Sequence, residues 1–338
     1  MDDLYRRVVV SPHRDSSTLH YYHKSKISLN DAVLDGLLQG GFTTKEISEL
    51  VGEASSGKTQ LCLQLLVHAV YPSCDGPSVG YKYPKAVYFY TEGGDAPLDR
   101  LKQIAWERCG KVPGQCREIL ENIYTEHSFV SEEDLICRLI RLEELLSSSE
   151  KMGRSVKVLV VDSIAFLFRD LDINNMWNAL SARSASFFKI AGLLKRYADE
   201  YDIAVVVTNH VVDLLPGAGS STDVSNNGYL ESFPGCAGLE LISNCKAIYP
   251  ALGISWSSCV NARFFVSKEA EYKDHVPCPV MYKGGPLDVA QNPGGTQHLS
   301  QVRGIQVVFS PDLPQAKAQF LIRWNGCCGI SYDASSVG

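Results

Sequence analysis

Residues 52–59 read Gly52-Glu53-Ala54-Ser55-Ser56-Gly57-Lys58-Thr59, which matches the pattern G-x-x-x-x-G-K-[ST] of a phosphate-binding loop. The stretch lies where such a loop must lie, because residues 47–51 are typical of a strand and residues 61–69 of a helix. Glycines let backbone N–H groups turn towards phosphate oxygens at the positive end of that helix. We predict a nucleoside triphosphate site here, in which Lys58 neutralises the β- and γ-phosphates and Thr59 ligates Mg²⁺. A glycine-containing turn that matches by accident is the alternative.

The predicted elements around this loop alternate between strands and helices. Strands are predicted at residues 86–90, 156–161 and 203–208, and helices at 98–108, 132–146 and 179–199. Such alternation indicates an α/β fold with a mostly parallel central sheet. The strands at 156–161 and 203–208 are nearly continuous runs of Val, Leu and Ile, so flanking helices are expected on both faces of the sheet. Further strands at 260–266, 304–309 and 320–324 make the C-terminal part β-rich.

The chain of 338 residues is expected to form one large domain between two tails. Residues 1–26 are polar and show neither the helix nor the strand period, so they are interpreted as a tail or linker. The nucleotide-binding core is placed at residues 27–330, and residues 331–338 form the second tail. Two stretches rich in Gly, Ser, Asn or Pro, at 211–244 and 272–303, are predicted to be long loops inside the core.

Composition excludes several classes of protein. With 45% hydrophobic and 21% charged residues, the chain is expected to be a soluble globular protein. No apolar run approaches the roughly 18 residues that cross a bilayer, and the first ten residues lack a secretory signal, so no membrane partner is expected. A formal charge of −6 gives no reason to expect a general nucleic-acid binder. The eleven cysteines show no C-x-x-C spacing, so they are interpreted as apolar fillers in a reducing compartment, and no metal site other than that for Mg²⁺ is predicted.

Polar side chains follow three of the predicted strands. Asp162 ends a buried strand and is the predicted second Mg²⁺ ligand, unless it only caps the next turn. Because Ser163 follows it, the residue that orients the attacking water must come from elsewhere, and Glu92 at the end of another strand is the candidate. Asn209 and His210 end a third strand, where they are predicted to sense the γ-phosphate or, alternatively, to cap the strand.

These features together resemble the RecA-like core of the eukaryotic recombinase and its paralogues. The segments that carry the resemblance are residues 34–42, 47–53, 57–65, 90–92 and 204–211. Within this family, residues 250–256 and 261–265 are most similar to the X-ray-repair cross-complementing group three branch, in its plant-type form. The resemblance implies a RecA-like P-loop ATPase core that binds ATP and Mg²⁺.

The resemblance also implies roles for residues outside the loop motif. It adds Gln60 to the nucleotide site and lays the side chain of Arg100 on the adenine, although an ordinary exposed helix arginine is the alternative. Ser310, Pro311 and Pro314 are similar to the family's segment that caps the ATP of the neighbouring protomer.

Departures from the family shape the expected function. Only 51 residues precede Gly52, so the family's N-terminal helical DNA-binding domain is expected to be absent. Its aromatic-x-x-Ala polymerisation motif is not visible in residues 1–30, and His210 stands where the recombinase has glutamine. Residues 211–256 contain four acidic residues and one lysine, whereas a strand-exchange loop needs positive charge to hold phosphates. These departures favour a mediator that works with partners over a strand-exchange engine.

The resemblance therefore predicts a paralogue in homologous-recombination repair of double-strand breaks. It is expected to form a heteromer with another paralogue of the same fold, to assist the recombinase filament on single-stranded or branched DNA, and to help process recombination intermediates. A weak, DNA-stimulated ATPase and a nuclear location, with some protein in the cytoplasm, are implied with it. Two alternatives stay open: a RecA-fold helicase or other P-loop ATPase with its own substrate, and a protein in which bound ATP is purely structural.

Overall fold

The computed structural model describes residues 24–71, 83–168, 176–213, 241–243, 246–269 and 301–331. Its helices are α1 (Ala32–Leu37), α2 (Lys58–Val70), α3 (Ala96–Arg108), α4 (Pro113–Glu121), α5 (Glu132–Lys151), α6 (Met176–Glu200) and α7 (Gly253–Ser257), with a 3₁₀ turn at Ile164–Phe168. Its strands are β1 (Lys26–Ile27), β2 (Phe42–Thr43), β3 (Glu46–Val51), β4 (Lys85–Tyr90), β5 (Ile123–Glu126), β6 (Val156–Asp162), β7 (Ala204–Asn209), β8 (Val211–Asp213), β9 (Leu241–Ser243), β10 (Lys246–Pro250), β11 (Ala262–Lys268), β12 (Arg303–Phe309), β13 (Lys317–Arg323) and β14 (Gly326–Gly329).

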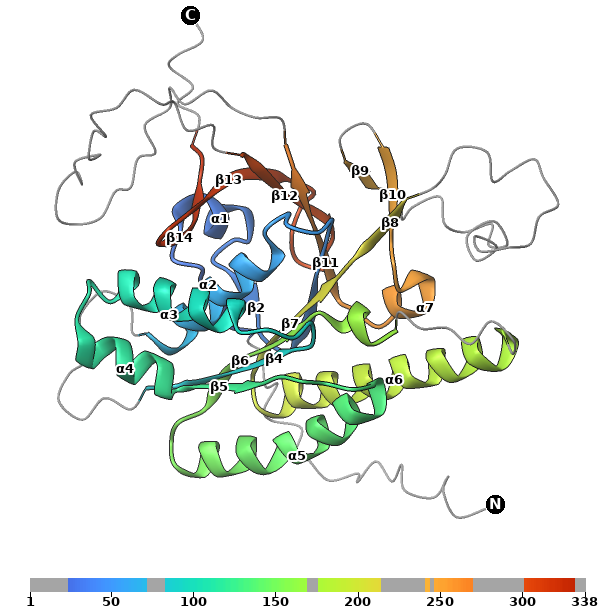
Figure 1. The fold of residues 1–338 in the computed structure, drawn as a ribbon, viewed down its shortest axis with the longest axis horizontal. Coiled ribbons are helices and arrows are strands. Elements are labelled where there is room, and N and C mark those ends of the chain that lie inside the picture. Colours follow the sequence, from blue (N-terminus) through green and yellow to red (C-terminus); the bar gives the residue numbers. More distant parts are fainter. Residues whose placement is uncertain are drawn as a thin grey trace, which may run out of the picture.

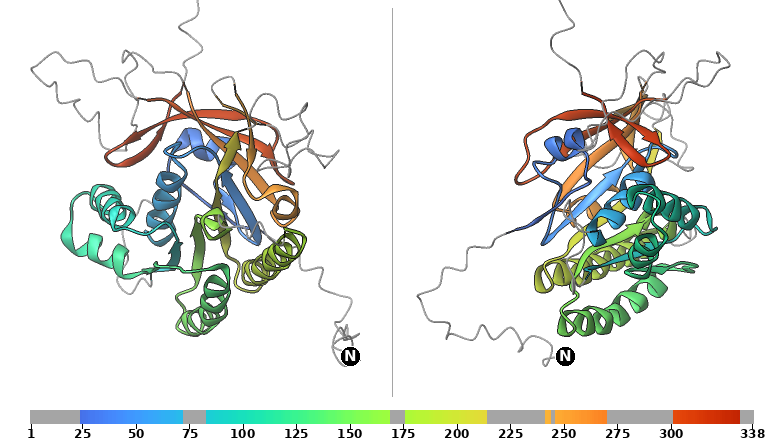
Figure 2. Two further views of the ribbon diagram at one scale, coloured as in Figure 1. Left: turned by 45° about the vertical axis from the view of Figure 1, so that its right-hand side comes forward. Right: turned by 90° about the vertical axis from the view of Figure 1, so that its left-hand side faces the viewer.

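A nine-stranded sheet runs through the described part of the molecule, in the order β14-β13-β12-β11-β3-β7-β6-β4-β5 (Figure 1). The strands from β11 to β5 are parallel to their neighbours, whereas β11, β12, β13 and β14 pair antiparallel in succession. Both the mostly parallel α/β sheet and the β-rich C-terminal part are therefore confirmed. Figure 2 shows the antiparallel strands, in orange to red, crossing over the blue helix α1, with which β13 and β14 are in contact.

Helices cover both faces of this sheet, as the apolar strand runs predicted. Along β7, Val206 packs into the cluster that contains the apolar sides of α2, α3 and α4. Its neighbours Val205 and Val207 point to the other face and pack with α5, α6 and Trp256 of α7. Because successive strand side chains alternate between faces, only a strand covered on both sides is apolar at every position. Burial on both faces therefore explains why β6 and β7 were predictable.

The N-terminal tail and the two long loops begin or end in regular structure. Lys24, inside the predicted tail, forms ion pairs with Glu46 and, at 3.1 Å, with Asp312, and β1 begins at Lys26. Because Glu46 and Asp312 anchor Lys24 to the core, the core includes Lys24 and does not start at residue 27. The ends of the predicted loop at 211–244 form β8 and β9, which pair with β10. These strands of two to five residues are too short to show a period. Residues 1–23, 332–338 and the interiors of both loops lie outside the described residues.

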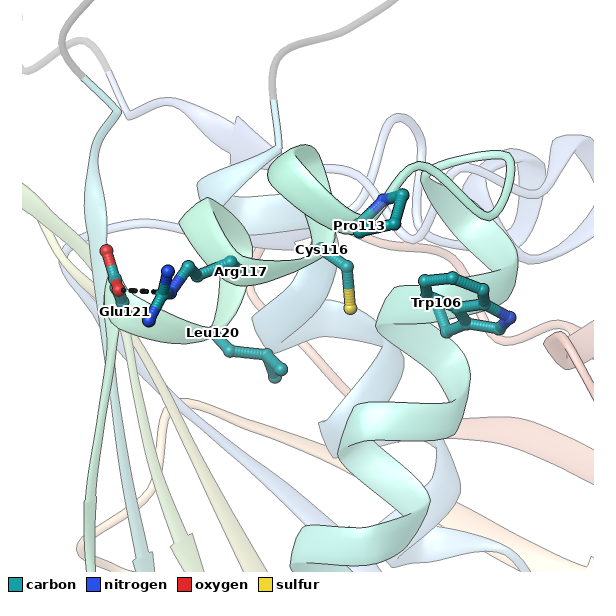
Figure 3. A pocket seen from close by; sticks show the side chains of 6 residues that line it. All are labelled: Trp106, Pro113, Cys116, Arg117, Leu120 and Glu121. Atoms are coloured by element: carbon teal, nitrogen blue, oxygen red, sulfur yellow. Dashed lines mark ion pairs between the residues drawn. The ribbon is translucent and has the colours of Figure 1, made fainter.

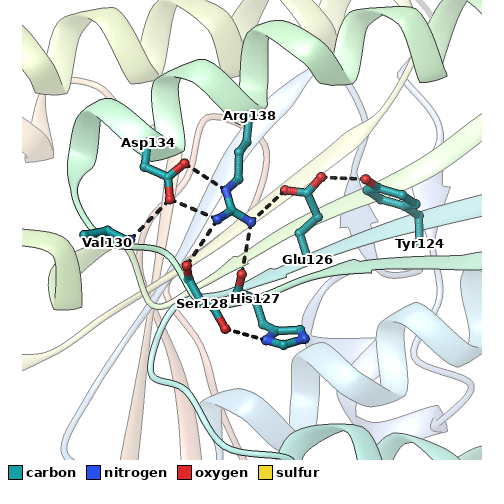
Figure 4. A network of polar contacts seen from close by, with 7 residues as sticks. All are labelled: Tyr124, Glu126, His127, Ser128, Val130, Asp134 and Arg138. Atoms are coloured by element: carbon teal, nitrogen blue, oxygen red, sulfur yellow. Dashed lines mark hydrogen bonds and ion pairs between the residues drawn. The ribbon is translucent and has the colours of Figure 1, made fainter.

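The edge strand β5 and helix α4 before it were not predicted from the sequence. Arg138 of α5 fixes the end of β5 (Figure 4). Its guanidinium donates to Asp134 at 3.0 Å and to Glu126 at 3.2 Å. It also donates to the backbone carbonyls of His127 and Ser128. These bonds hold the turn between β5 and α5, and the ion pair keeps the pKa of Asp134 below its ordinary value.

Two expectations about the whole chain can be compared with its described part. Six of the described cysteines are buried and one, Cys137, is exposed, and all seven are free thiols. Their role as small apolar fillers is consistent with the cluster memberships of Cys62, Cys109 and Cys327. None of the helices that the structure describes is long and apolar enough to cross a lipid bilayer.

Candidate nucleotide-binding site

The predicted phosphate-binding loop joins β3 to α2 at the carboxyl end of the parallel strands. Gly57 precedes the first helical residue and has a φ of +114°, in the left-handed region that favours glycine. A Cβ there would lie 3.1 Å from Cδ of Arg303 and 3.2 Å from Cζ of Phe320. A Cβ on Gly52 would lie 2.1 Å from the carbonyl oxygen of Val266, which is not sterically possible. Backbone conformation and close packing therefore require glycine at position 57, and close packing requires it at position 52.

Lys58 is buried at the start of α2, and its ammonium group turns back over the loop. Its Nζ donates to the carbonyl oxygens of Gly52 and Glu53, both at 2.8 Å. Burial lowers the pKa of Lys58, while the nearby carboxylates of Asp162 and Glu92 act to raise it. The loop thus holds a partly desolvated cation beside the N-terminus of a helix, which is the environment that binds phosphate.

Asp162 ends β6 and is held by hydroxyl groups from the two strands beside it. It accepts a hydrogen bond from Thr208 Oγ1 of β7 at 2.5 Å and from the hydroxyl of Tyr88 of β4 at 3.2 Å. The side chain is only 7% exposed. Burial and the adjacent carboxylate raise the pKa of Tyr88, so this phenol stays a donor. The sequence placed Thr208 at the end of this strand but did not predict its bond to Asp162, although strand alternation puts it on the face that packs against α2.

Glu92 and His210 come from strands on opposite sides of β6, and the structure brings them together. His210 Nε2 lies 2.6 Å from Oε1 of Glu92. Glu92 is about half exposed, at 47%, and His210 is 22% exposed, so the pair lies at the open end of the sheet. The sequence predicted that each residue lies near the γ-phosphate, but it did not predict the contact between His210 and Glu92.

Asn209 does not face the loop. It lies on the opposite face of the sheet from α2, where its side-chain amide donates to Glu49 Oε1 at 2.7 Å. The second oxygen of Glu49 accepts from Nε of Arg263 at 2.5 Å, and none of the three residues is exposed. In this structure the amide group of Asn209 is engaged in this buried network. Its role as a γ-phosphate sensor stays a prediction. The network itself was not foreseen.

Gln60 and Arg100 meet beside the loop, where Arg100 is not an ordinary exposed helix arginine, and its contact with adenine stays a prediction. Its Nε donates to Gln60 Oε1 at 2.7 Å. Its other nitrogens donate to the carbonyl oxygens of Trp324 at 2.9 Å and Arg323 at 2.5 Å, in the turn between β13 and β14. Burial lowers the pKa of Arg100. The side chain thus ties α2 and α3 to the C-terminal hairpin.

The segment Ser310–Pro314 lies away from the chain's own loop. Strand β12 begins beside the loop at Arg303, runs antiparallel to β11, and covers about 20 Å over its seven residues before the segment starts. Ser310 Oγ accepts from the backbone N–H groups of Asp312 and Leu313, both at 3.3 Å, and Pro311 and Pro314 are exposed. This turn is presented to the outside of the molecule and cannot cover the chain's own phosphate site.

Comparison with known proteins decides the family. A family model described as Rad51 matches residues 24–227, which is more than half of the chain. The chain belongs to the Rad51 family. The "DNA repair protein XRCC3 homolog" of Arabidopsis thaliana is 31% identical over 313 residues, which cover 90% of this chain and 93% of that protein. The "DNA repair and recombination protein RadA" of Metallosphaera sedula is 35% identical over 187 residues, which cover 55% of this chain and 53% of that protein.

Rad51-family membership, together with the 31% identity to the XRCC3 homolog, confirms the resemblance to the recombinase paralogues and to the group three branch. Members of the family are ATP-binding proteins. The site fits that ligand, because the hydroxyl oxygens of Ser56 and Ser163 are buried with no hydrogen-bond partner among the described residues. Thr59 and Asp162 are the residues that would hold Mg²⁺ there. Elsewhere in the described part of this Rad51-family chain, no cluster of three or more His, Cys, Asp or Glu side chains is arranged to bind a metal ion.

A concave region of this Rad51-family chain lies between α3 and α4. It is a cleft of about 490 Å³, lined by Trp106, Pro113, Cys116, Arg117, Leu120 and Glu121 (Figure 3). None of the residues predicted for the nucleotide site lines it. Arg117 and Glu121 form an ion pair at 3.2 Å beside it, so its two charged groups satisfy each other. We assign no ligand to this cleft.

The contacts of Arg100 predict an effect on folding. Replacing Arg100 with alanine removes its bonds to Gln60 and to the hairpin carbonyls, and we expect the free energy of unfolding to fall by about 1–3 kcal/mol. Urea denaturation measures this change. Lys102→Ala is the control, because Lys102 is exposed and, among the described residues, pairs only with exposed Asp99, and it should change stability by less than about 1 kcal/mol. Unchanged stability of Arg100→Ala, with ATP bound more than tenfold more weakly, would favour the adenine contact instead.

Proposed function

We propose that this chain is an ATP-binding Rad51-family paralogue that acts in homologous-recombination repair, bound to a second protein of the same fold. Family membership supports the repair role, and the names of the two similar proteins, a DNA repair protein and a DNA repair and recombination protein, agree with it. A repair role implies that the protein works in the nucleus.

At the nucleotide site, each residue has a chemical task. The ammonium of Lys58 neutralises phosphate charge, and Thr59 and Asp162 hold Mg²⁺, which supplies further charge neutralisation. Glu92 orients the attacking water with its carboxylate, which also contacts His210. Since one oxygen of Glu92 is already bonded, we expect hydrolysis to be slow until DNA or a partner changes the Glu92–His210 contact.

The observation that carries the partner proposal is the position of Ser310–Pro314. This turn lies at the far end of β12 from the chain's own loop, and its prolines are exposed. A segment that cannot reach its own nucleotide is suited to cover the nucleotide of a neighbour. Lys24 forms an ion pair with Asp312 of this turn at 3.1 Å, which links the turn to the start of the core.

Most of the DNA-binding surface of the complex is provided by the partner. The chain carries a formal charge of −6, and residues 211–256 contain four acidic residues and one lysine. Phosphate contacts need Lys and Arg, so the chain alone is expected to bind single-stranded or branched DNA weakly. The complex, together with the recombinase filament, supplies the cationic surface.

Co-expression with the recombinase paralogues of the same organism tests this proposal. We expect a one-to-one complex to co-purify, and its ATP hydrolysis to rise when single-stranded DNA is added. The variant Pro311→Glu/Pro314→Glu, which alters only exposed residues of the turn, should weaken the complex at interfaces where this turn caps a partner's ATP, and Lys102→Glu should leave it intact. A chain that purifies alone and unwinds duplex DNA would instead be a helicase. A chain that forms strand-exchange filaments by itself would overturn the proposal.

A further inference from the structure

Two cations lie opposite each other beside the phosphate-binding loop, on strands that belong to the C-terminal half of the chain. Lys268, at the end of β11, and Arg303, at the start of β12, are register partners in the antiparallel ladder. Partners in such a ladder point to the same face, and like charges directly opposite each other destabilise a sheet. The positive charge of Lys268 is close enough to Lys58 to oppose its protonation. An anion bound beside Lys268 and Arg303 would reduce the repulsion between these cations.

The nearest acidic side chain along these strands is not that anion. Glu269 follows Lys268 directly, but it forms an ion pair with Lys317 and accepts a hydrogen bond from Gln319, both of β13. Its carboxylate is thus engaged on the side of the sheet away from the loop residue Gly57, and among the described residues no ion pair joins it to Arg303.

Arg303 is packed against the loop with a donor left over. Its Cδ lies 3.1 Å from where a Cβ of Gly57 would be, so its stem covers the glycine at the start of α2. Its Nη1 donates to the carbonyl oxygen of Gln301 at 3.0 Å. Its Nε is buried and has no acceptor among the described residues. A buried N–H group of a cation without an acceptor is costly, so this donor is suited to a ligand in the adjoining loop.

We propose that Arg303, with Lys268 across the ladder from it, forms a second cationic arm of the nucleotide site and binds the phosphate chain of the nucleoside triphosphate held by residues 52–59. This inference rests on the proposed ATP binding and adds to it a residue about 250 positions away in the sequence from the loop motif. It also gives the antiparallel part of the sheet a direct part in nucleotide binding. Arg303 supplies a planar guanidinium, the side chain best suited to phosphate oxygens.

Nucleotide binding by the full chain with Arg303→Gln tests the proposal. The dissociation constants of Mg²⁺-ATP for wild type and variant are measured by isothermal titration calorimetry, and we expect the variant to bind about tenfold to a hundredfold more weakly. Arg303→Lys keeps the charge but lacks the Nε donor, so its affinity should lie between the two. Lys102→Gln removes one exposed charge from α3 and should bind as wild type does.

Thermal unfolding of the nucleotide-free variants separates binding from folding. A role in packing alone would lower the melting temperature of Arg303→Gln and leave its ATP affinity unchanged, and that result overturns the inference. If Arg303→Gln does not fold, a wild-type affinity for Arg303→Lys overturns it as well. If the wild-type chain binds no ATP, the proposed nucleotide function fails, which is a different result from a wild-type chain that binds and a variant that binds equally well.

Discussion

Replacing Lys58 with alanine is expected to weaken ATP binding by at least about a hundredfold. Lys58 is the buried cation of the loop, and its ammonium already lies where phosphate oxygens bind, held by the carbonyl groups of Gly52 and Glu53. Each hydrogen bond to a charged group contributes about 1.5–3 kcal/mol, and two such bonds to phosphate correspond to a hundredfold or more.

The measurement is the stabilisation of the folded chain by ligand. ATP at a hundred times its dissociation constant stabilises a binding protein by about 2.7 kcal/mol, and Lys58→Ala should show almost none of this effect at the same concentration. Lys102→Ala, on the exposed side of α3, should keep it. Equal stabilisation of Lys58→Ala and wild type would show that the loop does not bind ATP in the predicted way. A variant that binds no ATP yet still assembles with its partner would exclude a purely structural role for ATP in assembly.

The strands that the sequence marked most strongly are those with both faces buried. Strands β6 and β7 are apolar at nearly every position because their side chains pack on two helical layers, and the loop motif fixed the order of β3 and α2. Helix α4 and strand β5 were missed because they have nine and four residues, too few for a clear period. The order of the strands in the sheet could not be predicted from the sequence either. It is what brings His210 to Glu92, from strands that flank β6.

The residues of the site that could be predicted are those marked by a local sequence pattern, and the residues that could not are those paired only through the fold. Residues 52–59 and Asp162 stand at strand ends that a motif and an apolar run identify. Thr208 was within reach, since counting alternate positions along β7 places it beside Val206, on the face that α2 covers. Glu49 and Arg263, in contrast, are 214 positions apart, and a glutamate inside a strand usually indicates a solvent-facing position. Only the parallel pairing of β3 with β11 reveals that they are partners.

That buried pair gives the largest expected effect on stability. Glu49 and Arg263 are joined at 2.5 Å with both side chains nearly inaccessible, and Ser257 of α7 accepts a further bond from Arg263 at 2.7 Å. Replacing Glu49 with leucine leaves a buried guanidinium without a counter-charge, and we expect the free energy of unfolding to fall by about 3–5 kcal/mol. Urea denaturation of the purified chain measures this change.

The double variant Glu49→Leu/Arg263→Met decides whether the loss comes from the stranded charge. Two apolar side chains of similar volume remove both charges, so most of the stability lost in Glu49→Leu should return. The matched control is Glu143→Leu, because Glu143 and Arg196 form an ion pair of almost the same length, 2.6 Å, with both side chains 42% exposed. Water screens that pair, so its loss should cost less than about 1 kcal/mol. If the two single variants lost equal stability, burial would not be the cause. The guanidinium of Arg263 also lies 5.2 Å from the ring of Phe309, which directly precedes Ser310. The double variant Glu49→Leu/Arg263→Met should therefore also weaken any complex in which residues 310–314 cap a partner's ATP.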